Sequence, residues 1–395
     1  MAKMPGQAAL QDSSPAADDC PFVIRLTSLA MLISLAIGYR CYFTDGRIYG
    51  FAPVLGFLDT LPDTVNGTVF VLCILSLLWL TAFPYKRLPM FAVVFCQVFW
   101  VLQDIPRFQP FYYMYCFTFL VLALYQRSPK AALNAIRIMI CGVYFWAGFH
   151  KINMTFYESV FPWFLKPIYS FNDPSVPLVI QIPVELAVLA TPFVEAAIGI
   201  LLLFSSTRKY ACIMAFMMLT VVLMCLGPLG HNWAPIVWPW NVWLFWMEYR
   251  LLCTPTNRNL PFLLSGMPRI GVVSFLLFFI APAAAMWTLW YDFPGFKLYS
   301  GNTLTAEMHF PPEEMFQKVP EPMKATLKKD RFITPLGWVI LEKKSYHLPA
   351  IYTYKAAARG VCPYLDYPSK ATLKLLYPAP FYTLKHGTET LPLCP

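Results

Sequence analysis

Charged residues are scarce in this sequence. Asp, Glu, Lys and Arg make up 13% of its 395 residues, whereas a soluble globular domain carries about 25%. Hydrophobic residues make up 58%. A soluble chain of this composition could not cover its surface with polar groups, so we expect much of this protein to face lipid.

Motifs of several common enzyme classes are missing as well. The sequence has no P-loop, no dinucleotide-binding glycine fingerprint, no HExxH and no GxSxG motif. Its five histidines are spread along the chain without the spacing of metal ligands, and its 11 cysteines include no CxxC pair. We therefore expect no metal site and no metal-dependent catalysis.

The net charge of +9 does not indicate a nucleic-acid partner. The Lys and Arg residues are scattered between apolar runs instead of forming a stripe or patch. The partners that the composition indicates are the lipid bilayer and a lipophilic small molecule, and no protein partner follows from it.

Nine apolar stretches approach the length of a membrane-spanning helix, which needs roughly 17–25 residues. They cover residues 22–43, 67–84, 88–102, 111–125, 133–149, 183–204, 211–226, 235–252 and 270–289. We therefore predict an all-α fold, a polytopic transmembrane helical bundle of about nine spans over residues 22–290. An N-terminal tail (1–21) precedes it, and a small C-terminal domain (291–395) without long apolar runs follows it.

Positive charges set the expected orientation, because Lys and Arg prefer cytosolic loops. The loops after even-numbered spans carry most of them: Lys86, Arg87, Arg127, Lys130, Arg208, Lys209, Arg250, Arg258 and Arg269. We expect a cytosolic N terminus and a lumenal or extracellular C-terminal domain, in the endoplasmic reticulum or the plasma membrane. In that oxidising space Cys362 and Cys394 can form a disulfide or remain free thiols.

Polar residues gather in three of the odd-numbered loops, which all belong to the non-cytosolic face. They are Asp104, Arg107 and Gln109 after span three, His150, Lys151 and Asn153 after span five, and His231 and Asn232 after span seven. A few polar groups that converge among apolar walls are typical of an active site. Each also has a structural interpretation, as a local ion pair, an interfacial anchor or a helix cap.

Glu195 stands apart because it lies within span six, several residues from either end. An ionisable group at membrane depth indicates a functional site by default. The alternative is a protonated carboxyl that is hydrogen-bonded to a neighbouring helix, for which Gln97 in span three is a candidate partner.

The segment from Tyr144 to Asn153, which ends in His150-Lys151-Ile152-Asn153, resembles the signature of the horizontally transferred transmembrane (HTTM) family. That family includes the vitamin K-dependent γ-glutamyl carboxylases. Residues 104–110, 231–241 and 298–302 are similar to further motifs of its smaller members, so that the resemblance covers about residues 20–300. It implies a nine-span bundle with a lumenal site, in which Lys151 matches the lysine that deprotonates reduced vitamin K.

Two departures limit what the resemblance implies. The carboxylases carry an asparagine–histidine cluster where this chain has Phe108-Gln109-Pro110, and their lumenal domain is far larger than residues 291–395. We therefore expect a quinone- or lipid-directed enzyme instead of a protein carboxylase. A reduced quinone such as vitamin K hydroquinone is its candidate cofactor.

The sequence thus predicts a membrane enzyme that acts on a lipophilic, quinone-like molecule at the lumenal face. The candidate catalytic residues are Lys151, His150 and His231, and the candidate substrate-binding residues are Asp104, Arg107, Gln109, Asn153, Asn232 and Glu195. We expect Asp104 to pair with Arg107 and not with Lys151, because a carboxylate partner would favour the charged amine over the neutral base. The alternative is a non-catalytic transporter or assembly factor, and a transporter needs a polar path to both faces through Glu195.

Overall fold

Proline marks the beginning of several helices in this chain. Helices α4 (Pro110–Leu124) and α5 (Pro129–Phe149) both begin at a proline. Proline is tolerated there because an N–H group in the first turn of a helix has no hydrogen-bond partner within the helix. The computed structural model describes residues 15–43, 47–58, 60–169, 184–287, 292, 294–345, 348–379 and 387–394. Residues 1–14 of the expected N-terminal tail and the expected domain boundary between 290 and 291 lie outside them.

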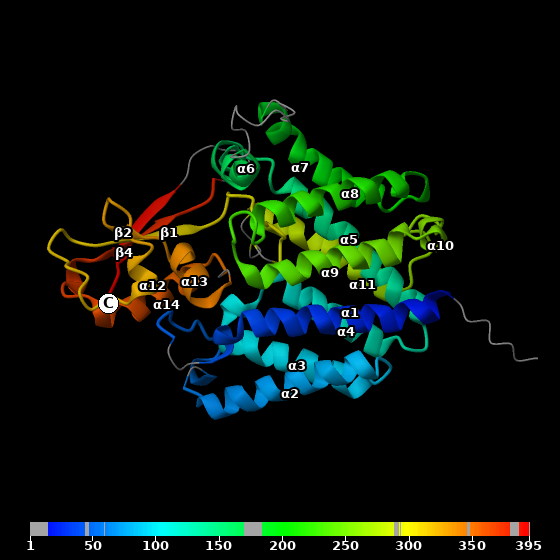
Figure 1. The fold of residues 1–395 in the computed structure, drawn as a ribbon, viewed down its shortest axis with the longest axis horizontal. Coiled ribbons are helices and arrows are strands. Elements are labelled where there is room, and N and C mark those ends of the chain that lie inside the picture. The colour runs from blue at the N-terminus through cyan, green and yellow to red at the C-terminus, as the bar shows by residue number, and fades with distance from the viewer. Residues whose placement is uncertain are drawn as a thin grey trace, which may run out of the picture.

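The larger part of the chain is a bundle whose helices run back and forth along one direction (Figure 1). Beside α4 and α5 it contains α1 (Pro15–Ile37), α2 (Asp63–Ala82), α3 (Arg87–Gln103), α7 (Val184–Leu201), α8 (Ser205–Leu226), α9 (Trp238–Glu248) and α11 (Arg269–Phe275). The π-helical turn η6 (Tyr249–Cys253) continues α9, and η7 (Leu276–Ile280) and η8 (Ala281–Trp287) continue α11. Shorter pieces lie in the connections: η4 (Phe156–Val160), α6 (Phe161–Tyr169) and α10 (Pro255–Arg258).

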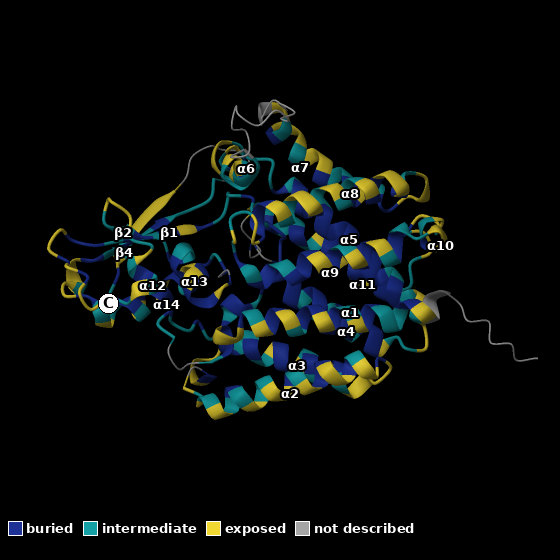
Figure 2. Ribbon diagram, viewed as in Figure 1, coloured by how far each residue is buried: buried dark blue, intermediate teal, exposed yellow. Residues whose placement is uncertain are grey.

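The helices have the length and surface expected of a membrane protein. Within the described residues, five segments are long and apolar enough to cross a membrane: Asp18–Ile37, Asp63–Ala82, Pro129–Phe149, Ser205–Leu226 and Arg269–Trp287. Figure 2 shows α5 buried inside the bundle and exposed outer faces on α2 and α8. On α2 these exposed residues include Val71, Leu75 and Leu78, which form an apolar stripe at helical spacing. The expectation of a helical, integral membrane protein is met, and the count of nine spans stays a prediction.

Helices α5 and α7 approach closely because two glycines remove side chains from their contact. A Cβ atom on Gly148 would lie 2.2 Å from the backbone nitrogen of Ala196, and one on Gly199 would lie 2.5 Å from the carbonyl oxygen of Cys141. Small residues commonly allow membrane helices to pack backbone against backbone. This approach brings the end of α5 beside Glu195 of α7.

The C-terminal domain is not all-α, which corrects the prediction for this part of the chain. It contains a four-stranded antiparallel sheet in the order β2-β1-β3-β4, formed by β1 (Thr305–His309), β2 (Phe332–Ile333), β3 (Thr372–Leu376) and β4 (Thr388–Pro392). More and less buried residues alternate along β1 and β3, as the pleat of a strand requires. Strands this short leave too few alternations to stand out in a sequence.

Three helices pack against this sheet: α12 (Glu321–Lys324), α13 (Pro335–Lys343) and α14 (Ile351–Val361). Trp338 of α13 and Tyr354 of α14 share one core with Met308 of β1 and Leu373 of β3. Cys362, which follows α14, and Cys394, which packs against this core, form a disulfide. Of the two alternatives left open by the sequence, the structure therefore has the disulfide.

The connection between α1 and α2 packs against α13 and α14 of the C-terminal domain. Tyr49 packs on Trp338 with ring centroids 4.9 Å apart. A Cβ atom on Gly50 would lie 2.1 Å from the carbonyl oxygen of Ala356, and one on Gly360 would lie 2.3 Å from that of Ile48. The domain is therefore fastened to one end of the bundle by backbone contacts that only glycine permits.

Replacing Gly148 with alanine tests the contact between α5 and α7. The added methyl group would collide with the α7 backbone, so we expect a loss of about 1–3 kcal/mol in stability and a lower midpoint of thermal unfolding in detergent. Gly56→Ala is the matched control, because a Cβ atom there meets nothing within 4 Å. Equal midpoints for the two variants would contradict the close approach.

Candidate functional site

The odd-numbered loops meet at the end of the bundle that carries the C-terminal domain (Figure 1). Arg47, before α2, bonds to Asp104, after α3. Asn153, after α5, donates to the carbonyl oxygen of Ser300 at 3.0 Å. The backbone N–H of Ile236, before α9, donates to the carbonyl oxygen of Lys344 at 3.3 Å. The polar residues that the sequence placed on one face are therefore at one end of the molecule.

Lys151 forms an ion pair with Glu195. Lys151 follows the last turn of α5, and Glu195 lies in the middle of α7, so the pair depends on the close approach at Gly148. The two side chains are 11% and 10% exposed. The pair explains how a carboxylate is tolerated at membrane depth, and Lys151, not Gln97, is its partner.

A cavity of about 940 Å³ opens beside this pair, and we call it the Lys151 cavity. Its polar lining residues are His150, Lys151, Asn153, Thr155, Glu158, Lys297 and Asn302, with apolar walls from α5, η4 and α7. Lys297 pairs with Asp292 at 3.1 Å. Three of the sequence-predicted residues, His150, Lys151 and Asn153, therefore share one cavity.

Asn153 holds the corner of this cavity in place. Its side-chain nitrogen donates to the carbonyl oxygen of His150 at 2.9 Å, and its side-chain oxygen accepts from the backbone N–H of Phe156 at 2.9 Å. His150 stacks on Trp146 with ring centroids 5.1 Å apart. Burial, helped by the positive charge of Lys297, lowers the pKa of His150 to about 3, so this imidazole is neutral at neutral pH.

A second cavity, of about 600 Å³, lies between the bundle and the C-terminal domain, and we call it the aromatic cavity. Trp163, Trp233 and Trp240 line its bundle side, and Leu304, Leu336 and Tyr354 line its domain side. Thr155 and Lys297 line both cavities. The two cavities thus adjoin at Thr155 and Lys297, and the Lys151 cavity is the more polar of the two.

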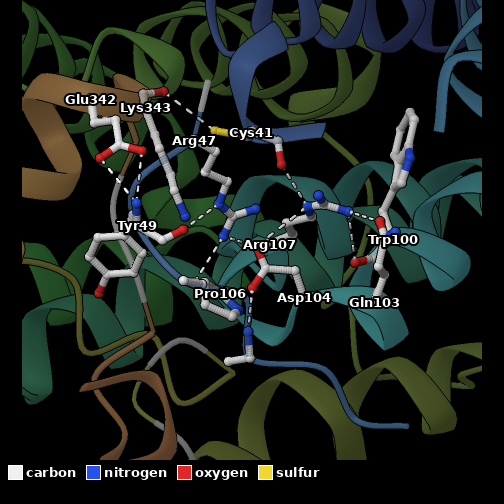
Figure 3. Close-up of polar contacts among 12 residues, drawn as sticks. Cys41, Arg47, Tyr49, Trp100, Gln103, Asp104, Pro106, Arg107, Glu342 and Lys343 are labelled. Carbon is white, nitrogen blue, oxygen red and sulfur yellow. Dashed lines mark hydrogen bonds and ion pairs between the residues drawn. The ribbon is translucent and has the colours of Figure 1, made fainter. Parts of the chain in front are cut away.

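Asp104 and Arg107 belong to a separate, buried cluster (Figure 3). Asp104 pairs with Arg107 at 3.6 Å, as predicted, and more closely with Arg47 at 2.7 Å. Arg107 donates to the carbonyl oxygen of Cys41 at 2.8 Å and to the side chain of Gln103 at 2.7 Å. None of these contacts involves Lys151.

Helix α13 closes this cluster from the C-terminal domain. Glu342 accepts from the backbone N–H groups of Ile48 and Tyr49 at 2.9 and 3.0 Å, and Figure 3 shows Lys343 beside Arg47. Burial and then the charge of Arg47 lower the pKa of Lys343 to about 7. Burial by itself would raise the pKa of Asp104, but Arg47, Lys343 and Arg107 together lower it.

The space left in this cluster is about 10 Å³, which is about the smallest volume that holds one water molecule. A substrate does not fit there. Asp104 and Arg107 therefore fasten the C-terminal domain to the bundle instead of lining a substrate cavity. Gln109 belongs both to the Asp104 cluster and to the aromatic cavity. It donates to the carbonyl oxygen of Pro106 at 2.8 Å and also lines the aromatic cavity.

His231 and Asn232 lie outside the lining of the Lys151 cavity. The His231 ring stacks on Trp163 at 4.3 Å, and its Nε2 lies 2.6 Å from the Trp163 carbonyl oxygen. Asn232 has a φ of +50° and continues the turn after α8. The structure therefore gives these two residues a place beside the aromatic cavity, and it does not bring them to Lys151.

Sequence reasoning missed Arg47, Lys297, Asp292 and Lys343. Arg47 entered only as one positive charge among those of the odd loops, and Lys297 adjoins the motif at residues 298–302. Asp292 and Lys343 lie in the C-terminal domain, where nothing in the sequence distinguishes them from surface charges. Only the folded chain shows that all four are buried or nearly so.

Replacing Asp104 with asparagine tests the fastening role of its cluster. The change leaves Arg47, Arg107 and Lys343 without their shared counter-charge, so we expect a loss of about 3–5 kcal/mol in stability. Adding Lys343→Met should recover part of the loss. Lys318→Gln, which removes an exposed ion pair with Asp366, is the control and should barely shift the unfolding midpoint.

The low pKa of His150 predicts a pH dependence of stability. An unfolded histidine has a pKa of about 6.5, so between about pH 6.5 and 3 the unfolded chain binds a proton that the folded chain does not. Stability should therefore fall as the pH falls through this window, by up to about 1.4 kcal/mol per unit. His150→Gln should lose this contribution, and parallel unfolding midpoints of wild type and variant from about pH 7.5 to 4.5 would contradict the assignment.

No family model matches this chain, and neither does any curated protein or solved structure.

Proposed function

We propose that this protein is a multi-pass membrane enzyme that acts on a lipophilic, quinone-like molecule, with Lys151 as the group that removes a proton. The observation that carries the proposal is the Lys151–Glu195 pair, which lies at the edge of a cavity of about 940 Å³. Lys297 joins this cavity to the aromatic cavity. A ring system with polar oxygens suits the first chamber, and an isoprenoid chain suits the second.

The proposed chemistry is a proton transfer from a bound hydroxyl to Lys151. A phenol-like hydroxyl has a pKa of about 10 and a lysine amine one of about 10.4, so a proton passes between groups of these types with little change in free energy. Pairing with Glu195 favours the charged amine of Lys151, whereas burial disfavours both charges. In the proposed step Lys151 therefore has to give its proton to Glu195 before it can act as a base. Its neutral amine then accepts the proton of a hydroxyl that is bound in the cavity, which leaves a substrate anion beside Lys297.

The other residues of the cavity bind and orient. His150 is neutral and is held by its stacking on Trp146, so it can accept or donate a hydrogen bond without adding charge. Asn153 keeps the loop after α5 in position. A reduced quinone such as vitamin K hydroquinone would supply the acidic hydroxyl, in keeping with the resemblance to the HTTM family.

The proposal also includes the orientation of the enzyme in its membrane. The cavities lie at the end that carries the C-terminal domain, and positive charges favour the opposite end as the cytosolic one. We therefore propose a lumenal or extracellular site, in the endoplasmic reticulum or the plasma membrane. The disulfide between Cys362 and Cys394 fits an oxidising compartment, but a second disulfide, Cys212–Cys253, lies at the opposite end, so the proposed orientation rests on the positive charges alone.

Substitution of Lys151 and Glu195 tests the proposal. In purified protein that is given vitamin K hydroquinone with dioxygen as the oxidant, loss of the hydroquinone should slow about 100-fold or more in Lys151→Arg and in Glu195→Gln. Arginine keeps the positive charge but cannot act as the base. Lys166→Ala, an exposed lysine in α6 at the same end, is the control and should leave the rate unchanged.

Two outcomes would count against this function. If Lys151→Arg turns over the hydroquinone as wild type does, Lys151 is an anchor and not a base. If wild type shows no turnover and a mass spectrum of its extracted lipids contains no quinone, the substrate class is wrong. Uptake of a solute into vesicles that depends on Glu195 would then favour the alternative of a transporter.

A further inference from the structure

Three potential metal ligands come together at the end of the bundle far from the proposed active site. They are Cys212 of α8, Glu248 at the end of α9 and Cys253 at the end of η6, and their ligand atoms all lie within 4.8 Å of one another. The two sulfur atoms are bonded in this structure. The sequence predicted no metal site, so this arrangement is a product of the fold.

The π-helical turn η6 creates the meeting of Glu248 and Cys253. Residues five apart lie on different sides of an α-helix, but a π-helix closes its hydrogen bonds from residue i to i+5. The backbone N–H of Thr254 donates to the carbonyl oxygen of Tyr249 at 3.2 Å in this way. Turns of this kind are frequent at functional sites, and this one turns both side chains toward α8.

Glu248 is poised as a ligand. It is completely buried, and one of its oxygens accepts from the hydroxyl of Tyr144 at 2.8 Å. Its other oxygen, Oε1, is buried and has no hydrogen-bond partner among the described residues. A buried carboxylate oxygen without a partner is costly, and a cation would satisfy it while Tyr144 fixes the orientation of the carboxylate.

The buried positive charge of Arg208 favours negatively charged ligands at this cluster. Arg208 precedes Cys212 by one turn of α8, so the two share a face. It is completely buried and donates to backbone carbonyl oxygens, among them those of Leu202 and Arg258, both at 2.8 Å. In the described part of the chain Arg208 has no carboxylate partner in an ion pair, so a site with net negative charge beside it would balance its charge.

The two cysteine pairs of the protein lie at opposite ends. Cys362 and Cys394 are in the C-terminal domain, whereas Figure 1 places α10, which begins two residues after Cys253, at the other end of the bundle. Disulfides persist in oxidising compartments and not in the cytosol. With the orientation proposed above, the Cys212 end adjoins the reducing compartment, where the pair exists as two thiols.

We propose that reduced Cys212 and Cys253, together with Glu248, form a buried binding site for a zinc ion that staples α8 to α9 and η6. Thiolates and carboxylates are both zinc ligands, and three protein ligands leave the fourth tetrahedral position to a water molecule. Binding releases the two thiol protons. Zinc–sulfur bonds of about 2.3 Å require the sulfurs to separate to roughly 3.8 Å in a tetrahedral site, a rearrangement that rotation of the two side chains provides.

Metal analysis of the full-length protein tests the site. Protein should be purified from cells through a peptide tag that does not bind metal, with free thiols alkylated at lysis in a parallel sample. We expect about one zinc ion per chain in the wild type, and most of it should be lost in Cys212→Ser, Cys253→Ser and Glu248→Gln. Cys225→Ser, which changes a free, buried cysteine of the same helix, is the control and should keep its zinc.

Replacing zinc with cobalt tests the ligands in the folded wild-type protein, so this test does not depend on whether the serine variants fold. Wild-type protein that is stripped with a chelator and loaded with Co²⁺ should show thiolate-to-cobalt absorption, and Glu248→Gln should weaken or shift it. A Cys212–Cys253 disulfide in the peptides of the alkylated sample, or two free thiols without zinc, would overturn the proposal. Zinc that remains in both serine variants would overturn it too, because the metal would then lie elsewhere.

Discussion

A charge buried beside lipid is stable only where the protein provides a counter-charge or a full set of hydrogen bonds. Much of this structure depends on that constraint. Lys151 forms an ion pair with Glu195, Arg47 and Arg107 form ion pairs with Asp104, and Lys297 forms one with Asp292. The Lys151–Glu195 and Arg47–Asp104 pairs join segments that are distant in the sequence, so that satisfying these charges also determines how the segments meet.

The contact between α5 and α7 shows how packing and charge depend on each other. Glycine at positions 148 and 199 lets the two backbones touch, and only at that separation does the side chain of Lys151 reach Glu195. The same approach forms one wall of the Lys151 cavity. The proposed site thus lies where a small residue, a buried acid and a helix end coincide.

The C-terminal domain contributes to the site although it lies outside the bundle. Its residues form half of the aromatic cavity, and the segment that leads into it carries Lys297. The Asp104 cluster and the glycine contacts at residues 50 and 360 hold the domain in place. The far end of the bundle has its own set of buried polar groups around Arg208 and Glu248, which are independent of the cavities.

The sequence by itself determined the apolar helices, their approximate bounds and the gathering of polar loops at one end, because hydrophobic length and charge placement are local properties. It predicted the pairing of Asp104 with Arg107, which are three residues apart. It could not show that Lys151 pairs with Glu195, that Arg47 and Lys343 join Asp104, or that Cys253 meets Cys212. Those partners are separated by tens to hundreds of residues, and only the packing of helices and the docking of the C-terminal domain decide which side chains share one buried space.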